Sequence, residues 1–436
     1  MSTPPVEVPV EAATRRRRWK WLLPPMAVLV TLVLVESGYR LKLYLHIGHT
    51  PLGVSVTYQA WNRSTTRFDR QFGLRYEPNS RAVGVRVTDG RPVLLLERST
   101  DPRGNVGASG DGYDQAALKV VVVGDSFTEN QRDGTTWPAL LEDELASRIR
   151  GNVGVLNFAR SGHGLLQMVD LAAEQAEQSG PDIVVVAFIS DDLNRDRFWQ
   201  TTRDLGGEPR LVTMLAPDAR SGWPASAEIY DERIDMAWCR RVLDRPGDDD
   251  PLLAELTERF ETRKRDNPLR IDYASLTSSF LYNRLVYKDP FFGQAGKAAT
   301  PRFGWRDFGR DAAAVDSIGR LKRTDARLVL VQLPQVEELE AGRSLMTGQQ
   351  RALRASLERL AGRSVIELQA RAPAHPQPRS LFLLPHDHHP SRQGLAWLAR
   401  AVADVLVNDR IVPSDDATEG RRDHDRPRST EAPGKR

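Results

Sequence analysis

The chain has 436 residues, of which 40% are hydrophobic and 27% are charged, a composition typical of a globular protein with one or two folded domains. Its 61 basic and 58 acidic residues give a formal net charge of +3, so no global field points to nucleic acid, and we expect no nucleic-acid partner. The single cysteine, Cys239, excludes an intrachain disulfide and a cysteine-based zinc cluster.

The N-terminal residues have the pattern of a membrane anchor. Four arginines, Arg15–Arg18, precede an uncharged apolar run over 22–35. With its aromatic flanks, the segment 19–39 reaches the roughly 20 residues that one helix needs to cross the hydrocarbon core. Because basic residues stay on the cytoplasmic side, we predict a basic cytoplasmic tail over 1–18 and a transmembrane signal anchor over 19–39, with the lipid bilayer as its partner.

A cleaved signal peptide is the alternative interpretation of this N-terminal segment. Cleavage requires small residues in a defined pattern after the apolar run, and the sequence VESGYRLK offers no clear site of this kind. We therefore favour an uncleaved anchor, which would leave the rest of the chain outside the cytoplasm.

Residues 40–115 lack long helical periodicity and are expected to form a small β-rich lead-in. Within them, the stretch VGVRVTDGRPVLLLE reads as two short strands joined by Asp89-Gly90. This pair is favoured in the tight turn of a β-hairpin. We expect the lead-in to pack on the main domain.

From residue 117 onwards, predicted strands and helices alternate. The strands are apolar, mostly β-branched runs at 117–123, 153–158, 183–189, 327–333 and 365–368, and helical spacing of apolar residues occurs over 135–149, 165–178 and 391–407. Such alternation predicts an α/β fold in which helices cover both faces of a parallel sheet. We therefore expect a three-layer α/β/α, flavodoxin-like domain over 116–410.

Two stretches fall outside this alternation. Residues 195–325 are too long for a simple crossover, and we interpret them as a large insertion that forms a cap or lid beside the active site, although a surface insertion without function is the alternative. Residues 411–436 have almost no apolar side chains, so we expect a disordered tail.

Four polar stretches follow the predicted strands or precede the last helix. They are Gly124-Asp125-Ser126, NFARSGHG (157–164), ISDDLNR (189–195) and HDHHPSRQG (386–394). In an open parallel sheet, ligands bind in the crevice beyond the carboxyl ends of the strands. We therefore expect all four stretches to meet at one edge of the sheet.

Ser126 has two interpretations. Because Asp and Ser favour turns and helix caps, Asp125-Ser126 can be explained by local structure alone. Alternatively, Ser126 is a nucleophile, which requires a base, an orienter for that base and donors for an oxyanion. His389 is then the candidate base and Asp387 its orienter. The backbone amides of Ser126 and Gly162 are the candidate oxyanion donors.

The order of GDSF, N…SGHG, FISDDL and D-x-H-P-S-x-x-G resembles the SGNH (GDSL) hydrolases, in particular bacterial members with one N-terminal membrane anchor and an extracytoplasmic catalytic domain. The resemblance covers 117–200 and 326–407, the FGLRYEPNS stretch of the lead-in fits that subgroup loosely, and the insertion is unmatched. It implies the SGNH hydrolase fold and a single-pass protein of the bacterial inner membrane, with its catalytic domain in the periplasm or outside the cell.

The resemblance assigns the catalytic roles to Ser126, His389 and Asp387. It also assigns an oxyanion donor to Gly162, and we expect Asp125, Asn157 and Asp191 near the oxyanion and substrate pocket. We expect no cofactor, and no metal either, because the adjacent histidines at 386, 388 and 389 point in different directions and no further ligand spacing supports a site.

The sequence departs from the family pattern at two places. Asp191 stands where the family usually has an asparagine that donates to the oxyanion, and an ionised carboxylate there would repel developing negative charge. Burial could keep Asp191 protonated, Asn194 could replace the donor, or the site could be weak. Asp387 is two residues ahead of His389 rather than the usual three, which leaves His386 as an alternative base.

Three functions remain open from the sequence. The first is a membrane-anchored serine esterase that removes O-acyl groups, with acetyl as the expected group, from an acylated carbohydrate or another ester substrate. The second is an O-acyltransferase that modifies envelope or exported polysaccharide, in which a sugar hydroxyl replaces water. The third is a catalytically inactive SGNH domain that binds carbohydrate, which the carboxylate at position 191 keeps in consideration.

Overall fold

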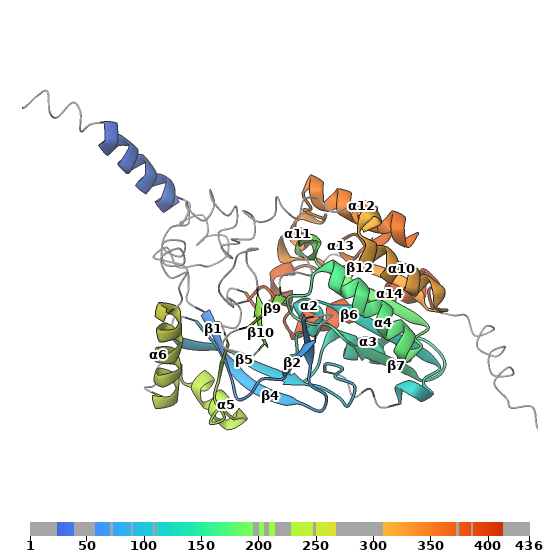
Figure 1. Ribbon diagram of the computed structural model, residues 1–436, viewed down its shortest axis with the longest axis horizontal. Helices are drawn as coiled ribbons and strands as arrows, with labels where there is room; N and C mark the ends of the chain where they lie inside the picture. The colour runs from blue at the N-terminus through green and yellow to red at the C-terminus, as the bar shows by residue number, and fades with distance from the viewer. Residues whose placement is uncertain are drawn as a thin grey trace, which may run out of the picture.

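A computed structural model describes most of the chain (Figure 1). The described residues are 24–38, 57–69, 73–88, 90–107, 110, 112–194, 200–204, 209–213, 228–246, 250–266, 308–371, 375–384 and 387–412. Most of the predicted tail and part of the predicted insertion lie outside these ranges.

The centre of the molecule is a parallel sheet. Its strands are β6 (Leu118–Gly124), β7 (Val153–Asn157), β8 (Ile183–Phe188), β12 (Arg327–Gln332) and β13 (Val365–Glu367). They lie in the order β13-β12-β8-β6-β7, and every neighbouring pair is parallel. Numbered along the chain, this order is the 2-1-3-4-5 arrangement of flavodoxin-like folds. The predicted α/β fold with a parallel sheet is confirmed.

Helices cover both faces of this sheet, which produces three layers. On one face, α3 (Trp137–Ala146) and α14 (Arg392–Asn408) pack against the sheet and each other. The other face is covered by α4 (Leu165–Ser179), α10 (Ala312–Arg323) and α12 (Gly348–Ala361). Strand β8 is buried at every position, as expected of a β-branched run that lies between two helical layers.

Short helices connect these elements. They are η1 (Tyr113–Gln115), α2 (Ser126–Glu129), η2 (Ser190–Asn194), η6 (Phe308–Arg310), α11 (Val336–Ala341), α13 (Leu368–Arg371) and η7 (Pro378–Leu381). Two of them, α2 and η2, follow the carboxyl ends of β6 and β8, the neighbouring strands at which the strand order reverses. Ligands of open α/β sheets bind at this switch point.

A second sheet is formed by the lead-in. It contains β1 (Thr57–Trp61), β4 (Arg81–Thr88), β5 (Arg91–Ser99) and β11 (Glu228–Tyr230), in the order β11-β1-β4-β5. Strands β4 and β5 are antiparallel neighbours on either side of Asp89-Gly90, as the hairpin signal predicts. Two small pairs complete the strands, β2 (Thr66–Asp69) with β3 (Gly73–Tyr76) and β9 (Gln200–Asp204) with β10 (Pro209–Thr213).

Residues 228–266 of the predicted insertion, as far as the structure describes them, do not form a separate cap. Strand β11 extends the lead-in sheet by pairing with β1, and helices α5 (Met236–Asp244) and α6 (Pro251–Asp266) cover one face of that sheet (Figure 1). The shared core includes Tyr58 and Phe260, whose rings stack with centroids 4.8 Å apart. Residues far apart in the sequence thus form one unit, because the apolar face of the lead-in sheet must be covered.

Within the predicted anchor, residues 24–38 form a helix, and residues 19–23 and 39 lie outside the described part. The apolar side chains of this helix, such as Leu29 and Leu34, are exposed. None of the helices in the described part of the chain has both the length and the apolar character that a membrane span requires.

Gly394, the last residue of the D-x-H-P-S-x-x-G pattern, is required by close packing. A Cβ at this position would overlap with the carbonyl oxygen of Leu381 and lie 3.1 Å from the Cβ of Pro390. We expect Gly394→Ala to lower the free energy of unfolding by about 1–3 kcal/mol through overpacking. Thermal or urea unfolding will measure this loss.

Gly319→Ala provides the matched control for this prediction. Gly319 lies within α10, and the nearest heavy atom to an added Cβ is the Arg323 side chain at 3.5 Å. Alanine is favoured over glycine in a helix by about 0.5–1 kcal/mol, so this variant should be as stable as the wild type or more so. Equal stability of Gly394→Ala and the wild type would contradict the packing argument.

Candidate active site

The GDS tripeptide forms the turn between β6 and α2. Gly124 lies so close to the neighbouring strand that a Cβ would be 2.8 Å from the carbonyl oxygen of Ala187. Asp125 is fully buried and caps α2, since its Oδ1 accepts a hydrogen bond of 2.9 Å from the Phe127 amide. Ser126 is the first residue of α2 and is only partly buried. The cap interpretation therefore holds for Asp125, and the Ser126 hydroxyl makes one long hydrogen bond, of 3.5 Å, to Asp125 Oδ2.

Asn157 also lies beneath the site, although it is predicted to lie near the pocket. Its side chain has no exposed surface, and its Nδ2 donates to the carbonyl oxygens of Val106 at 3.1 Å and Thr128 at 3.2 Å. Its Oδ1 accepts from the Ala159 amide at 3.0 Å. Asn157 is thus a structural tie between the end of β7, the lead-in and α2. A side chain in this position cannot contact a substrate directly.

The second polar stretch lies beside the GDS turn. The Arg160 amide donates to the Gly124 carbonyl oxygen at 3.0 Å, and the Ser161 amide donates to a carboxylate oxygen of Glu129. The following residue, Gly162, has a φ of 80°, a conformation that glycine adopts without steric cost. These contacts hold the Gly162 backbone next to α2, as the two-amide oxyanion hypothesis requires.

Glu129 is a buried anion that the sequence analysis did not single out. Arg98 Nη2 donates to its Oε1 at 3.1 Å, and Arg160 Nη1 lies 3.6 Å from its Oε2. Burial alone would raise the pKa of the Glu129 carboxyl, but the charges of the two arginines, together with hydrogen bonds from Tyr76 and the Ser161 amide, outweigh it and hold the pKa below its ordinary value. Glu129 is therefore ionised and fixes the position of the loop that contains Gly162.

The histidine loop holds an Asp–His pair. The Nδ1 atom of His389 lies 2.5 Å from Oδ1 of Asp387, and the His389 amide donates to the same oxygen at 3.2 Å. The Asp387 side chain is 6% exposed, whereas that of His389 is 25% exposed. The contact turns Nδ1 of His389 toward the buried carboxylate of Asp387, and a general base needs this arrangement. His386, the alternative base, lies outside the described residues.

Two arginines surround the second oxygen of Asp387. Arg86 Nη1 lies 2.7 Å and Arg132 Nη2 lies 3.9 Å from Oδ2. Burial by itself would raise the pKa of Asp387. The charge of His389 and its hydrogen bond to the carboxylate lower this pKa, and so do the charges of the two arginines, so that it lies well below its ordinary value. Burial and the proximity of Arg86 lower the pKa of Arg132 to about 10, against the effect of Asp387. The Asp387 carboxylate is thus a permanent anion at neutral pH.

The Asp–His pair lies next to the serine turn. The rings of Phe127 and His389 contact each other with centroids 5.3 Å apart, and Asn130 Nδ2 donates to the Pro390 carbonyl oxygen at 3.2 Å. Phe127 directly follows Ser126. These two contacts bring together segments that are more than 250 residues apart in the sequence, so a hydroxyl and an imidazole share one edge of the sheet.

The third polar stretch follows β8 and contains Asp191. The proposal that Asp191 is buried at the oxyanion pocket gains no support from the structure. Asp191 is exposed, and its Oδ2 accepts from Gln335 Nε2 at 3.3 Å. Its neighbours are buried instead. Ser190 Oγ donates to Glu338 at 2.5 Å, and Asp192 Oδ2 accepts from the Ile189 amide at 2.9 Å. The burial that the first alternative for position 191 requires is therefore absent, and the Asn194 side chain lies outside the described part.

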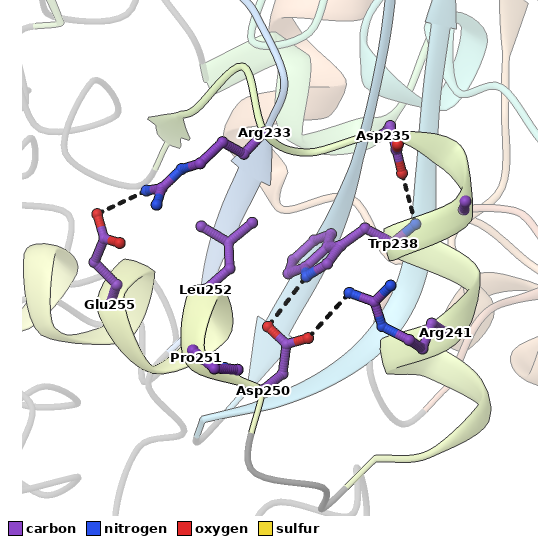
Figure 2. Close-up of a pocket in the computed structure, with 9 residues that line it drawn as sticks. Arg233, Asp235, Trp238, Arg241, Asp250, Pro251, Leu252 and Glu255 are labelled. Atoms are coloured by element: carbon purple, nitrogen blue, oxygen red, sulfur yellow. Dashed lines mark hydrogen bonds and ion pairs between the residues drawn. The ribbon is translucent and has the colours of Figure 1, made fainter.

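A pocket of about 440 Å³ elsewhere contains none of the predicted site residues. It lies between α5 and α6, and its lining includes Trp238, Arg241 and Asp250 (Figure 2). Its polar groups bind one another, since Asp250 accepts from Trp238 Nε1 at 3.1 Å and from Arg241 Nη2 at 3.3 Å. These hydrogen bonds stabilise the packing of the two helices.

In the described part of the chain, no group of three or more His, Cys, Asp or Glu side chains is arranged to hold a metal ion.

The comparisons with known proteins agree with the sequence motifs for part of the chain. Residues 120–227 match the family model described as GDSL-like Lipase/Acylhydrolase. This match supports the resemblance to the GDSL/SGNH lipases and acylhydrolases. The matched segment contains the first three polar stretches and ends before the histidine loop. A search of curated protein sequences gave no significant match.

Several solved structures are similar to parts of the chain. A lipase/acylhydrolase from Enterococcus faecalis is 11% identical, with a TM-score of 0.29, and covers 67% of this chain and 97% of its own. A member of the lipolytic protein G-D-S-L family from Veillonella parvula is 12% identical, with a TM-score of 0.29, and covers 67% and 99%. A Bacillus subtilis protein is 13% identical, with a TM-score of 0.32, and covers 83% and 78%. Because these TM-scores are low, the fold is assigned from the strand order of the central sheet and not from these structures.

Glu129→Gln is expected to lower the free energy of unfolding by about 3 kcal/mol at pH 7, because it leaves two buried arginines without a counter-charge. Since the pKa of folded Glu129 lies below its ordinary value of 4.5, its stabilising effect is fully present above that pH. The effect is lost as the pH falls through the folded pKa. Urea unfolding at pH 7 and at lower pH should therefore show the two proteins converging in acid.

Glu142→Gln is the control with the opposite sign. Glu142 also accepts a backbone hydrogen bond, from Val155 at 2.8 Å, but burial raises its pKa. Relative to this variant, the wild type should gain stability as the pH falls. A difference between wild type and Glu129→Gln that does not change with pH would contradict the ionised state of Glu129.

Proposed function

We propose that the protein is a serine esterase that acts on O-acyl esters. The observation that carries the proposal is the contact between the serine turn and the Asp–His pair, at the switch point of a parallel sheet. The match to a lipase and acylhydrolase family model supports the same reaction class. Asp387, held ionised by buried cations, supplies the fixed negative charge that an imidazolium requires.

The reaction proceeds in two balanced steps. Ser126 Oγ attacks the ester carbonyl carbon while His389 Nε2 takes the hydroxyl proton. The tetrahedral intermediate collapses, and the imidazolium gives this proton to the departing alkoxide, which leaves as an alcohol. Water then attacks the acyl-enzyme, with His389 as the base. The acid leaves, and Ser126 Oγ regains a proton from the imidazolium.

The oxyanion of each intermediate requires donors. The backbone amides of Ser126 and Gly162 are the proposed pair, because the Glu129 and Gly124 contacts hold the second loop beside the first. Asp191 is exposed and accepts a hydrogen bond from Gln335, so we propose that this site depends on its backbone amides more than a site with an asparagine at that position. Loss of one donor costs about 3–4 kcal/mol of transition-state stabilisation, which predicts a slow rather than an absent reaction.

The substrate class that we propose is an acetylated carbohydrate. This proposal is supported by the sequence motifs, which resemble those of membrane-anchored hydrolases. Release of acetate from a chromogenic acetyl ester, with and without a glycan acceptor, separates hydrolysis from acyl transfer. Formation of an acylated glycan would favour the transferase.

Ser126→Ala is expected to abolish labelling by a fluorophosphonate probe and to reduce ester hydrolysis by a factor on the order of 10³–10⁴. His389→Ala should reduce hydrolysis similarly, because the hydroxyl then keeps its proton. Gel fluorescence and acetate release measure the two effects.

Ser147→Ala is the matched control, since Ser147 lies at the end of α3 and its hydroxyl bonds only locally, to the Glu144 carbonyl oxygen at 2.8 Å. This variant should label and hydrolyse like the wild type. If the folded wild-type protein does not label, the esterase proposal fails, and a binding domain with a carboxylate at position 191 becomes the better account.

We also propose that residues 19–39 anchor the chain in the inner membrane, with the catalytic domain outside the cytoplasm. The support is the arginine run before an uncharged segment, and the exposure of apolar residues such as Leu29 (62%) and Leu34 (66%) on helix 24–38. Full-length protein should stay in the membrane fraction after washing with alkaline carbonate, whereas protein without residues 1–38 should be released. Release of both forms would contradict the anchor.

A further inference from the structure

The face of the lead-in sheet that is turned away from α5 and α6 carries two arginines. Arg86 lies in β4 and Arg98 in β5. The strand register pairs Arg86 with Leu94 and Arg98 with Ala82, so both arginines project from the same face. The opposite face, which includes Val85, packs in the core with α5 and α6.

Both arginines bind acidic residues of the candidate active site. Arg86 binds Asp387, the partner of the imidazole, and Arg98 binds Glu129, which holds the Gly162 loop. Side-chain exposure is 14% for Arg86 and 12% for Arg98. The lead-in sheet therefore does more than pack on the catalytic domain, because it supplies buried counter-charges to two loops at the catalytic edge.

The two oxygens of the Asp387 carboxylate have different partners. One oxygen of Asp387 faces His389 Nδ1 at 2.5 Å, and the other faces Arg86 Nη1 at 2.7 Å. A carboxylate held at both oxygens cannot rotate about its Cβ–Cγ bond without breaking an ion pair. The irregular register of the hairpin, between Arg86 and Val87, lies at the same point, and such β-bulges often direct a side chain toward a site.

We propose that Arg86 is a positioning residue that holds Asp387 in the orientation required by His389, so that the lead-in sheet completes the active site. The proposal rests on the proposed esterase function. The contact of Arg86 in the candidate site is with Asp387. It acts through Asp387, and its loss should lower the rate of the chemical step without changing the affinity for substrate.

The second cation near Asp387 does not replace Arg86. Arg132 Nη2 is 3.9 Å from Oδ2, beyond hydrogen-bond distance, and Arg132 uses its Nη1 to donate to the Gln131 carbonyl oxygen at 2.7 Å. Without Arg86, the buried carboxylate would keep the more distant charge of Arg132 but would lose the 2.7 Å contact at Oδ2. We therefore expect it to rotate and to release the imidazole.

The test compares Arg86→Met with Arg86→Lys in the full-length protein. For hydrolysis of a chromogenic acetyl ester, Arg86→Met should lower kcat at least tenfold and leave KM within about twofold of the wild type. Arg86→Lys keeps a cation that can approach Oδ2 of Asp387, so this variant should recover most of kcat. Equal kcat for the wild type and Arg86→Met would overturn the proposal.

Arg75→Met is the matched control for a purely structural effect. Arg75 lies in β3 and pairs with Glu174 of α4 at 2.5 Å, so it also connects the lead-in to the catalytic domain, through a partner that lies in a helix and not in the histidine loop. Its side chain is similarly shielded, at 24% exposure. Arg75→Met should change the thermal midpoint without changing kcat. A fall in kcat as large as that of Arg86→Met would also overturn the proposal.

A measurement that does not require turnover separates this proposal from the esterase proposal. The proton on His389 Nδ1, bonded to Asp387, should give a low-field NMR signal in the wild type and in Arg75→Met, and Arg86→Met should lose or shift it. If the wild type does not hydrolyse esters but this pattern holds, the esterase proposal fails and the positioning role stands. If the signal is the same in all three proteins, the positioning role fails whatever the activity.

Discussion

A carboxylate can be buried only beside cations or hydrogen-bond donors, and this constraint organises the catalytic edge of the molecule. Asp387 and Glu129 are both shielded from solvent, and both are paired with arginines from the lead-in sheet. Each acid in turn holds a part of the candidate site, the imidazole of His389 or the loop before Gly162. Removing either arginine would therefore disturb a catalytic loop as well as an interface.

This arrangement explains why the lead-in and part of the insertion form one unit. One face of the lead-in sheet is apolar and requires a cover, and the other carries two arginines, which require acids, beside an apolar cluster that includes Trp61 and Leu96. Helices α5 and α6 provide the cover, and the loops around Ser126 and His389 provide the acids. The pocket between α5 and α6 follows from that packing, since its polar groups are paired with one another. Figure 1 shows the two sheets side by side.

The polar groups around the serine turn divide into two kinds. Asp125 and Asn157, though part of the sequence pattern, are fully buried and bond to backbone atoms, so they shape the turn and do not meet a substrate. Ser126 and His389 keep partial exposure, which chemistry requires. Asp191 is exposed at the edge, and its charge is the feature that sets this site apart from one with a neutral donor.

The sequence by itself determined the strands and helices of the central domain and their alternation along the chain, because β-branched runs and helical spacing are local signals, whereas the order of the strands in the sheet came from the tertiary structure. It also singled out Ser126, Asp387 and His389, since residues at strand ends and before a helix carry recognisable patterns. Only the tertiary structure showed that Arg86 and Glu129 take part. Arg86 forms an ion pair with Asp387, 301 residues further along the chain, and Glu129 forms one with Arg98, 31 residues away. A local sequence pattern does not show which charged side chains will lie opposite each other when two distant segments pack together.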